Sequence, residues 1–345
     1  MGFLWFWIVA VMIAMYVVFD GFDLGVGILY PFLARTEADR QTLIHSIGPV
    51  WDGNEVWLLA GGGTLFFAFP LAYASSFSGF YLPLMIVLWL LILRGLSIEL
   101  RMHLESTTWR SLFDGLFFLS SALLAIFFGA ALANVIRGVP LGPDNYFFLP
   151  LWTNWRVGAL PGILDWYTVI GGLVALIALA MHGALYLVMK APGELEKRAR
   201  SFARSIWIVL LLITIVSLVA TIAVRQSALN NYRAHPILFL IPVLVIASLA
   251  GVQLFGKKPL AAFLSSCAYL IFMLVGAATG LYPTILASST NAANDITIAK
   301  SLSGPHTLHV GLVWWSIGMV LAVVYFCTTY FMFRGKVPDD ASYGH

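Results

Sequence analysis

The chain is organised around two acidic motifs, FDGFDLGVGILYPFL at residues 19–33 and GPVWDGNEVWLL at residues 48–59. The first places Asp20 and Asp23 inside a long apolar stretch, and the second places Asp52 and Glu55 where the next apolar stretch begins. An ionised side chain inside a bilayer costs several kcal/mol, so such groups usually face a protein interior or a wet pathway. The four acids therefore indicate a function that is carried out within the membrane.

The composition around these motifs excludes an ordinary soluble domain. Of 345 residues, 61% are hydrophobic and 10% are charged, against about 25% charged residues in soluble domains. Nine apolar runs are long enough to cross the hydrocarbon layer, and they lie near residues 3–33, 54–75, 79–100, 112–136, 165–189, 204–225, 236–255, 261–286 and 306–333. We therefore predict an all-α integral membrane protein with about nine transmembrane helices, arranged as two four-helix bundles plus one additional helix.

We expect a single polytopic membrane domain over residues 1–345. Its predicted parts are a first four-helix bundle with the acidic motifs (1–137), an outer loop rich in Pro and Trp (138–164), the remaining five helices (165–335) and a cytoplasmic tail (336–345). Thirteen Lys and Arg residues follow odd-numbered runs and five follow even-numbered runs. Because Lys and Arg accumulate in cytoplasmic loops, the N-terminus should face outward and the C-terminus the cytoplasm. This distribution explains the net charge of +3, and no nucleic-acid-binding pattern accompanies it.

The first apolar run places its two acids in the inner half of the membrane. At about 1.5 Å per residue, Asp20 and Asp23 lie about 15 and 10 Å before Tyr30, which suits an aromatic belt at the inner interface. Gly21 and Gly25 form a small-residue pair that lets another helix approach closely. We expect both acids to be held against protein and shielded from lipid.

The second motif leaves two interpretations of Asp52 open. Aspartate is a preferred helix N-cap, and a negative charge near a helix N-terminus is stabilised by the exposed amides. Glu55 lies about one turn deeper and continues the acids into the membrane. Asp52 is therefore either a cap alone or a cap that also accepts protons, and we place Asp52, Glu55, Asp20 and Asp23 on a candidate proton pathway.

An arginine in the third apolar run requires a partner. Arg94 lies about 21 Å from the outer end of that run, near the level of Asp20 and Asp23. Since arginine does not lose its proton in proteins, it must be paired or must reach an interface. We expect one structural polar cluster that joins Asp20 or Asp23 to Arg94, Arg101, Asp114, Asn54 and Trp57. The alternative is that Arg101 and Asp114 simply flank the bilayer in water.

The histidines and cysteines offer no convincing cofactor site. His182 could ligate a haem, although a hydrogen-bonded interior residue is the more ordinary interpretation of one membrane histidine. His306 and His309 have a metal-compatible spacing, but no carboxylate or cysteine completes a site. Cys267 and Cys327 lie in apolar runs and are interpreted as packing residues. We therefore predict no metal and no haem ligand on this chain.

Several motifs closely resemble subunit II of the bacterial cytochrome bd-type quinol oxidases. The segments Asp20-Gly21-Phe22-Asp23-Leu24-Gly25 and Trp51-Asp52-Gly53-Asn54-Glu55-Val56-Trp57 carry the resemblance. Further matches occur at Phe77–Tyr81, Thr108–Asp114, Tyr186–Leu195, Pro236–Leu238 and Pro283–Thr290. These matches are spread over nearly the whole chain, and the WDGN segment is specific.

The resemblance implies one half of a heterodimeric oxidase in the bacterial plasma membrane. A haem-bearing subunit I would hold haems b and d and the quinol-oxidation loop, a very small extra subunit could join, and the complex would oxidise quinol and reduce O₂ to water. This chain would support assembly and contribute part of a cytoplasmic proton route, with Asp52 as the first acceptor. A structural quinone or lipid could rest between its helices.

Two other classes remain open from the residues. Intramembrane acids, glycines and prolines also mark secondary transporters, but those predict broken helices at corresponding positions in the two halves. The acidic motifs here occur only in the first half. A purely structural membrane subunit, with every acid ion-paired, is the third interpretation.

Overall fold

The computed structural model describes residues 1–338, and residues 339–345 of the predicted tail lie outside the described residues. The long helices are α1 (Gly2–Leu33), α3 (Trp51–Ala68), α5 (Tyr81–Leu100), α6 (Thr107–Arg137), α7 (Trp166–Lys190), α8 (Gly193–Val224), α10 (Leu240–Leu254), α11 (Pro259–Leu281) and α13 (Pro305–Met332). The short elements are α2 (Glu37–Ile47), α4 (Pro70–Gly79), α9 (Asn230–Ala234), α12 (Ile298–Ser301), three 3₁₀ turns (Gln226–Leu229, Pro236–Phe239, Ala292–Asn294) and the antiparallel pair β1 (Thr284–Leu286) and β2 (Ile296–Thr297).

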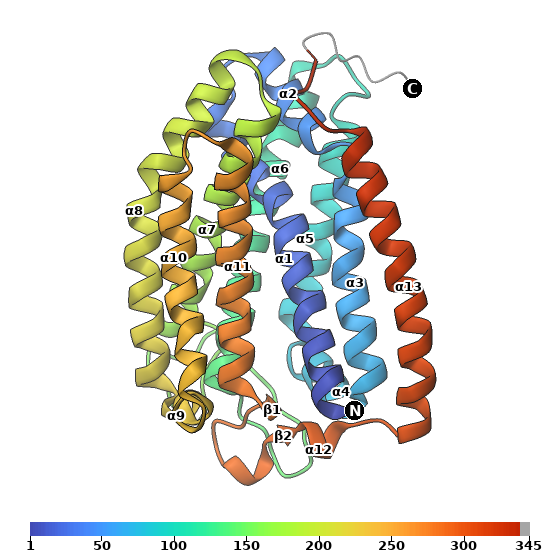
Figure 1. The fold of residues 1–345 in the computed structure, drawn as a ribbon, viewed down its shortest axis with the longest axis vertical. Helices are drawn as coiled ribbons and strands as arrows, with labels where there is room; N and C mark the ends of the chain where they lie inside the picture. The colour runs from blue at the N-terminus through green and yellow to red at the C-terminus, as the bar shows by residue number, and fades with distance from the viewer. Residues whose placement is uncertain (339–345) are drawn as a thin grey trace.

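The long helices run side by side, with α2 at one end of the molecule and β1 and β2 at the other (Figure 1). We name these the α2 end and the β end. In the described part of the chain, eight helical segments are long and apolar enough to cross a membrane. Helix α3 is more polar than these segments because it starts with the second acidic motif, and it lies alongside α1 and α13 in Figure 1. The predicted all-α membrane fold with about nine spanning helices is confirmed.

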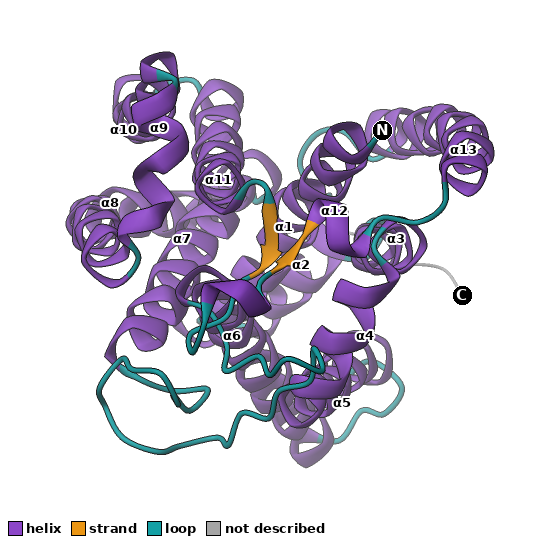
Figure 2. Cartoon of the chain, turned by 90° about the horizontal axis from the view of Figure 1, so that it is seen from below, coloured by secondary structure: helices purple, strands orange, loops and turns teal. Residues whose placement is uncertain are grey.

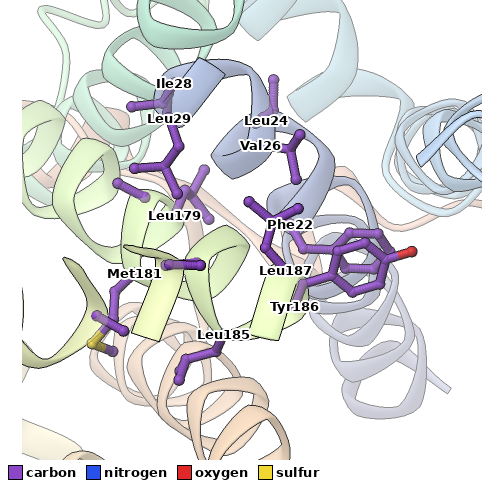
Figure 3. Close-up of a cluster of buried hydrophobic side chains, with 14 of the residues drawn as sticks. Phe22, Leu24, Val26, Ile28, Leu29, Leu179, Met181, Leu185, Tyr186 and Leu187 are labelled. Carbon is purple, nitrogen blue, oxygen red and sulfur yellow. The ribbon is translucent and has the colours of Figure 1, made fainter. Parts of the chain in front are cut away.

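Helices α1, α3, α5 and α6 form a first helical group, and α7, α8, α10 and α11 form a second. The two groups meet where α1 and α6 contact α7, and α13 lies outside them (Figure 2). The contact is close because glycines face each other: a Cβ atom at Gly25 would lie 2.1 Å from the Leu179 carbonyl oxygen and 2.7 Å from the Gly183 Cα. Buried Phe22, Leu24 and Leu29 of α1 pack beside α7 in the same core, together with the other side chains drawn in Figure 3. The small-residue spacing in the first motif therefore positions α1 at the centre of the molecule.

The second predicted span is divided into α3 and α4. The division falls at Phe69 and Pro70, because proline has no backbone N–H to donate to the preceding turn of a helix. Proline is common at the first position of a helix, and Pro70 begins α4. The Ser303 hydroxyl donates to the Phe67 carbonyl (2.6 Å), and the Ser303 amide donates to the Ala68 carbonyl (3.0 Å). These bonds tie the start of α13 to the break.

The segment between the two acidic motifs contains a helix that the sequence did not predict. Helix α2 starts with a capping box, in which the Asp39 amide donates to the Thr36 hydroxyl (3.1 Å) and the Thr36 amide donates to the Asp39 carboxylate (3.1 Å). Burial alone would raise the pKa of Asp39, but the amides of Arg35 and Thr36 and the nearby Arg198 guanidinium lower it. Helix α2 is short and of mixed polarity, so its sequence resembles a charged loop and contains no apolar run that predicts a helix.

The loop between α6 and α7 is anchored at the end of α6. Arg137 is buried and forms an ion pair with Asp165, the N-cap of α7. Asn134 donates to the Ile163 carbonyl (3.0 Å), and the Val139 amide donates to the Ala287 carbonyl (2.9 Å). The loop is thereby joined to the segment that contains β1.

Candidate functional site

A buried ion pair lies at the centre of the first helical group. Arg94 of α5 and Asp20 of α1 are both fully buried, and the guanidinium donates twice to the carboxylate, over 2.8 and 2.5 Å. Glu55 of α3 lies 3.0 Å from the same guanidinium, with 25% of its side chain exposed. Three helices thus bring one cation and two acids together, at the level that the depth calculation predicts for Arg94 and Asp20.

Asp23 lies one turn further along α1 and has a different environment. It is buried, and it accepts a hydrogen bond from the Asn54 side-chain amide over 2.7 Å. The side-chain oxygen Oδ1 of Asn54 in turn accepts a hydrogen bond from the Tyr330 hydroxyl over 2.9 Å, which links α1, α3 and α13. Among residues 1–338, Asp23 has no ion pair, and its Oδ1 atom has no hydrogen-bond partner. Asp23 is therefore held by a neutral group alone.

The predicted N-cap role of Asp52 is wrong. Helix α3 begins at Trp51, its N-cap is Val50, and no side chain caps it. Asp52 lies in the first turn and is exposed, so its charge still lies close to the free amides of the helix start. It lies at the start of α3, at the α2 end and one turn before Glu55.

Trp57 packs with aromatic rings, although it was expected in the polar cluster. Its ring stacks on Phe19 at 5.9 Å between centroids and lies 5.3 Å from Phe326. Its indole N–H has no hydrogen-bond partner in the described part of the chain. Asn54 and Trp57 are three residues apart and both face α1 and α13, but Asn54 contacts polar groups there and Trp57 contacts aromatic rings.

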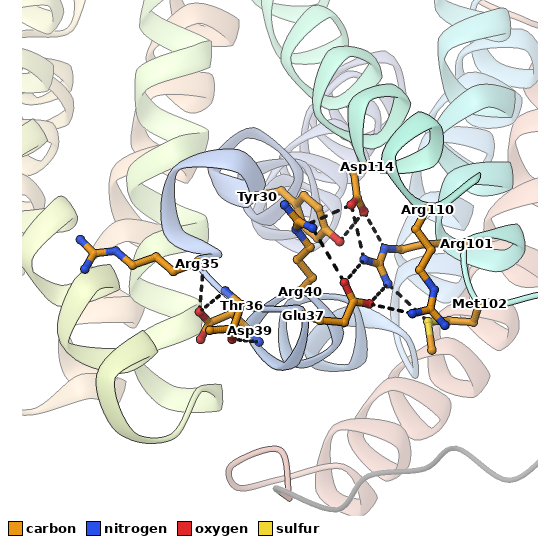
Figure 4. Close-up of polar contacts among 10 residues, drawn as sticks. All are labelled: Tyr30, Arg35, Thr36, Glu37, Asp39, Arg40, Arg101, Met102, Arg110 and Asp114. Atoms are coloured by element: carbon orange, nitrogen blue, oxygen red, sulfur yellow. Dashed lines mark hydrogen bonds and ion pairs between the residues drawn. The ribbon is translucent and has the colours of Figure 1, made fainter. Parts of the chain in front are cut away.

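The predicted single polar cluster is divided into two. Arg101 is buried at the end of α5 and pairs with Asp114 of α6 (2.5 Å) and Glu37 of α2 (2.9 Å). Tyr30 donates to Asp114 over 2.6 Å, and these residues form one network at the α2 end (Figure 4). Arg94 and Arg101 are seven residues apart, or about 10 Å along the helix, so neither reaches the partners of the other. The proposed alternative, in which Arg101 and Asp114 merely flank the bilayer in water, does not match this paired geometry.

The histidine positions are now defined. His182 is fully buried, with Nδ1 2.7 Å from the Ser266 hydroxyl and Nε2 3.0 Å from the Val18 carbonyl. Both ring nitrogens are engaged in hydrogen bonds, as the interpretation of His182 as an interior residue predicts. His309 contacts the Pro305 carbonyl through Nδ1 (2.7 Å). Within residues 1–338, no group of three or more His, Cys, Asp or Glu residues could hold a metal ion.

A long apolar groove separates α13 from α1 and α3. It has a volume of about 700 Å³, and its lining extends along α13 from His306 to Phe326. Trp5, Trp57 and Trp315 also line it. The indole nitrogens of these three tryptophans are buried and have no hydrogen-bond partner in the described part of the chain. No sequence pattern predicts this groove, because its walls come from three separate helices.

The fold and the site together define a multi-pass membrane protein with carboxylates held around one buried arginine. Residues 1–333 match the family model described as cytochrome bd terminal oxidase subunit II. This chain belongs to that family, and it is therefore a subunit of a respiratory terminal oxidase complex.

Relatives of known name agree with this assignment. The chain is 31% identical to the cytochrome bd-I ubiquinol oxidase subunit 2 of Escherichia coli strain K12, with 98% of this chain and 95% of that protein covered. It is also 31% identical to the cytochrome bd ubiquinol oxidase subunit 2 of Bacillus subtilis, covering 89% and 88%. A chain of the bd oxidase from Geobacillus thermodenitrificans has a similar fold, with a TM-score of 0.75, 15% identity and coverage of 96% and 98%.

Proposed function

We propose that this chain conducts protons toward the oxygen-reducing centre of a quinol oxidase and supports assembly of its partner. The partner would be a haem-bearing subunit I that holds haems b and d and handles quinol and O₂. Family membership and the names of the relatives support this complex. The Lys and Arg distribution supports a cytoplasmic α2 end, so protons would arrive there.

The observation that carries the proposal is the imbalance of charge around Arg94. Asp20 accepts hydrogen bonds from both terminal nitrogens of the Arg94 guanidinium, and Glu55 forms an ion pair with one of them. Within residues 1–338, Asp23 accepts a hydrogen bond only from the neutral Asn54 side-chain amide. A carboxylate that is buried without a cation takes up a proton more readily than one that is ion-paired. Asp23 and Glu55 are therefore the acids best suited to alternate between protonation states.

The arrangement favours a stepwise route from the α2 end. Asp52 is exposed and would accept protons first, and Glu55 lies one helical turn deeper with part of its side chain still accessible. Asp23 would be the deeper acceptor. Burial makes transfer through carboxyl groups and ordered water far less costly than transfer of a free ion. Asp20 was expected on the proton pathway, but we propose instead that it neutralises Arg94 and holds the Arg94 side chain in place.

Site-directed variants test the route. Asp52→Asn and Asp23→Asn should each slow oxygen consumption by the purified complex while haem content and subunit stoichiometry stay unchanged. Loss of one positioned proton carrier costs roughly 10²-fold or more when its step limits the rate. Glu105→Gln is the matched control, because Glu105 is also exposed at the α2 end and has no ion pair in residues 1–338.

The outcomes separate the three classes. Full turnover in both aspartate variants would remove the route and leave a purely structural subunit. Absence of stoichiometric haem absorption in the native purified complex would instead favour the transporter interpretation. Slow turnover with intact haem absorption supports the proposal.

A second proposed role concerns the groove beside α13. Its apolar length suits an isoprenoid or acyl chain, and the partnerless indole N–H groups of Trp5, Trp57 and Trp315 could donate to carbonyl oxygens. We propose that it holds a structural quinone or lipid. Organic extraction of the purified complex would identify the molecule, and equal recovery from a Trp57→Phe/Trp315→Phe variant would argue against this location.

A further inference from the structure

We propose that the groove between α8 and α10 at the α2 end binds the phosphate headgroup of an anionic phospholipid. The groove lies where α7, α8, α10 and α11 converge and is lined by the small residues Ala203, Gly256 and Ala262. It is small, with a volume of about 20 Å³, so a phosphate group would rest at its mouth. Arg204 of α8 and Gln253 of α10 supply polar groups at its wall. This inference does not depend on the proton route.

Three of the cations around this groove lack acidic partners within residues 1–338, whereas a fourth, Arg200, is paired with Glu196. Arg204, Lys257 and Lys258 are exposed, and none has an ion pair within residues 1–338. Their neighbours behave differently, as Arg198 pairs with Asp39 (2.8 Å) and Lys197 with Glu194 (2.6 Å). Three unpaired positive charges are therefore gathered at one lateral face, and this pattern suits a phosphate group.

Arg200 holds the two lysines near this groove. Its guanidinium donates to the Gly256 carbonyl over 2.5 Å and pairs with Glu196 over 2.7 Å. The first bond fixes the turn between α10 and α11 against α8. Because Lys257 and Lys258 directly follow Gly256, that bond holds their backbone beside the groove that Arg204 lines. The charge of Arg200 itself is satisfied, so it acts as a structural tie.

The surface below the groove favours a lipid over a free anion. Ile208 and Leu212 of α8 and Leu254 and Leu260 beside the turn are 49%, 57%, 80% and 61% exposed. Such an apolar surface next to cations matches acyl chains that descend from a phosphate headgroup. This face lies on the opposite side of the molecule from α13 (Figure 1). It therefore remains separate from the groove proposed for a quinone or lipid.

Lipid binding to the intact oxidase complex tests the proposal. The complex is placed in phosphatidylcholine nanodiscs that contain increasing phosphatidylglycerol, and bound phosphatidylglycerol is counted by native mass spectrometry. At about 1 kcal/mol per basic residue near an anionic headgroup, Arg204→Gln/Lys257→Gln/Lys258→Gln should weaken binding roughly a hundredfold at low salt. The double variant Lys257→Gln/Lys258→Gln, at two exposed positions, should weaken phosphatidylglycerol binding roughly tenfold or more. It replaces the triple variant in this test if the triple variant does not assemble.

A charge-matched control removes three other cations at the same end, in the variant Arg35→Gln/Lys197→Gln/Arg334→Gln. It should retain the tight phosphatidylglycerol site. The proposal is overturned if the groove variants bind as tightly as the native complex, or if the control loses as much affinity. It is also overturned if millimolar inorganic phosphate displaces the lipid completely, since the site would then recognise a free anion.

Discussion

Replacement of Arg94 should destabilise the protein far more than replacement of its principal partner. Arg94→Gln leaves Asp20 fully buried without a cation, because Asp20 has no other ion pair in residues 1–338. Removing one member of a buried ion pair costs about 3–5 kcal/mol. Asp20→Asn leaves Arg94 with Glu55 at 3.0 Å, so we expect a smaller loss of about 2 kcal/mol.

The double variant Arg94→Gln/Asp20→Asn isolates the coupling between the two groups. It removes both charges, so it should lose less free energy of unfolding than the sum of the single variants, by about 1–3 kcal/mol. The free energies are measured by titrating the purified complex with an anionic detergent and following near-UV circular dichroism.

Arg233→Gln is the matched control for this cycle, because Arg233 is exposed and belongs to α9, which lies at the β end in Figure 1. Its substitution should change the free energy of unfolding by less than about 0.5 kcal/mol. Equal costs for Arg94→Gln and Asp20→Asn would refute the argument that Glu55 is a second partner. Additive costs in the double variant would refute the ion pair itself.

Two further predictions concern packing and pH. Gly25→Ala should lower the free energy of unfolding by about 1–3 kcal/mol or more, because its Cβ would lie 2.1 Å from the Leu179 carbonyl oxygen. Gly62→Ala is the control: its Cβ meets nothing within 4 Å, so it should be neutral or slightly stabilising in the same detergent titration. The lowered pKa of Asp39 adds stability that is fully present above its ordinary value of 3.8 and is lost as the pH falls through the lowered pKa. Asp39→Asn should remove this dependence, and an unchanged acid limb of the stability profile would contradict it.

The sequence could predict the spanning helices and the depth of the charged residues. Apolar length, the spacing of Gly21 and Gly25, and the count of residues from Tyr30 depend on local chemistry alone. They were sufficient to bring Asp20 and Arg94 to the same level. The need for an arginine partner also follows from one residue, because a buried guanidinium keeps its charge.

Sequence alone could not decide which acid pairs with which arginine. That choice depends on the rotation of α1, α3 and α5 about their axes, and no local pattern specifies it. Glu37 was missed as a partner of Arg101 for the same reason, and because α2 has no apolar run. The prediction that Asp52 caps α3 was wrong because the N-cap is Val50, two residues before Asp52.

The charges around Arg94 have one more consequence. Asp20, Asp23 and Glu55 together carry three negative charges when ionised, against a single positive charge on Arg94. Electroneutrality of this buried volume is therefore reached only after two hydrogen ions have bound. Since uncompensated charge is most costly at low dielectric, the proton route that we propose would require this site to hold two hydrogen ions before it passes one to the partner.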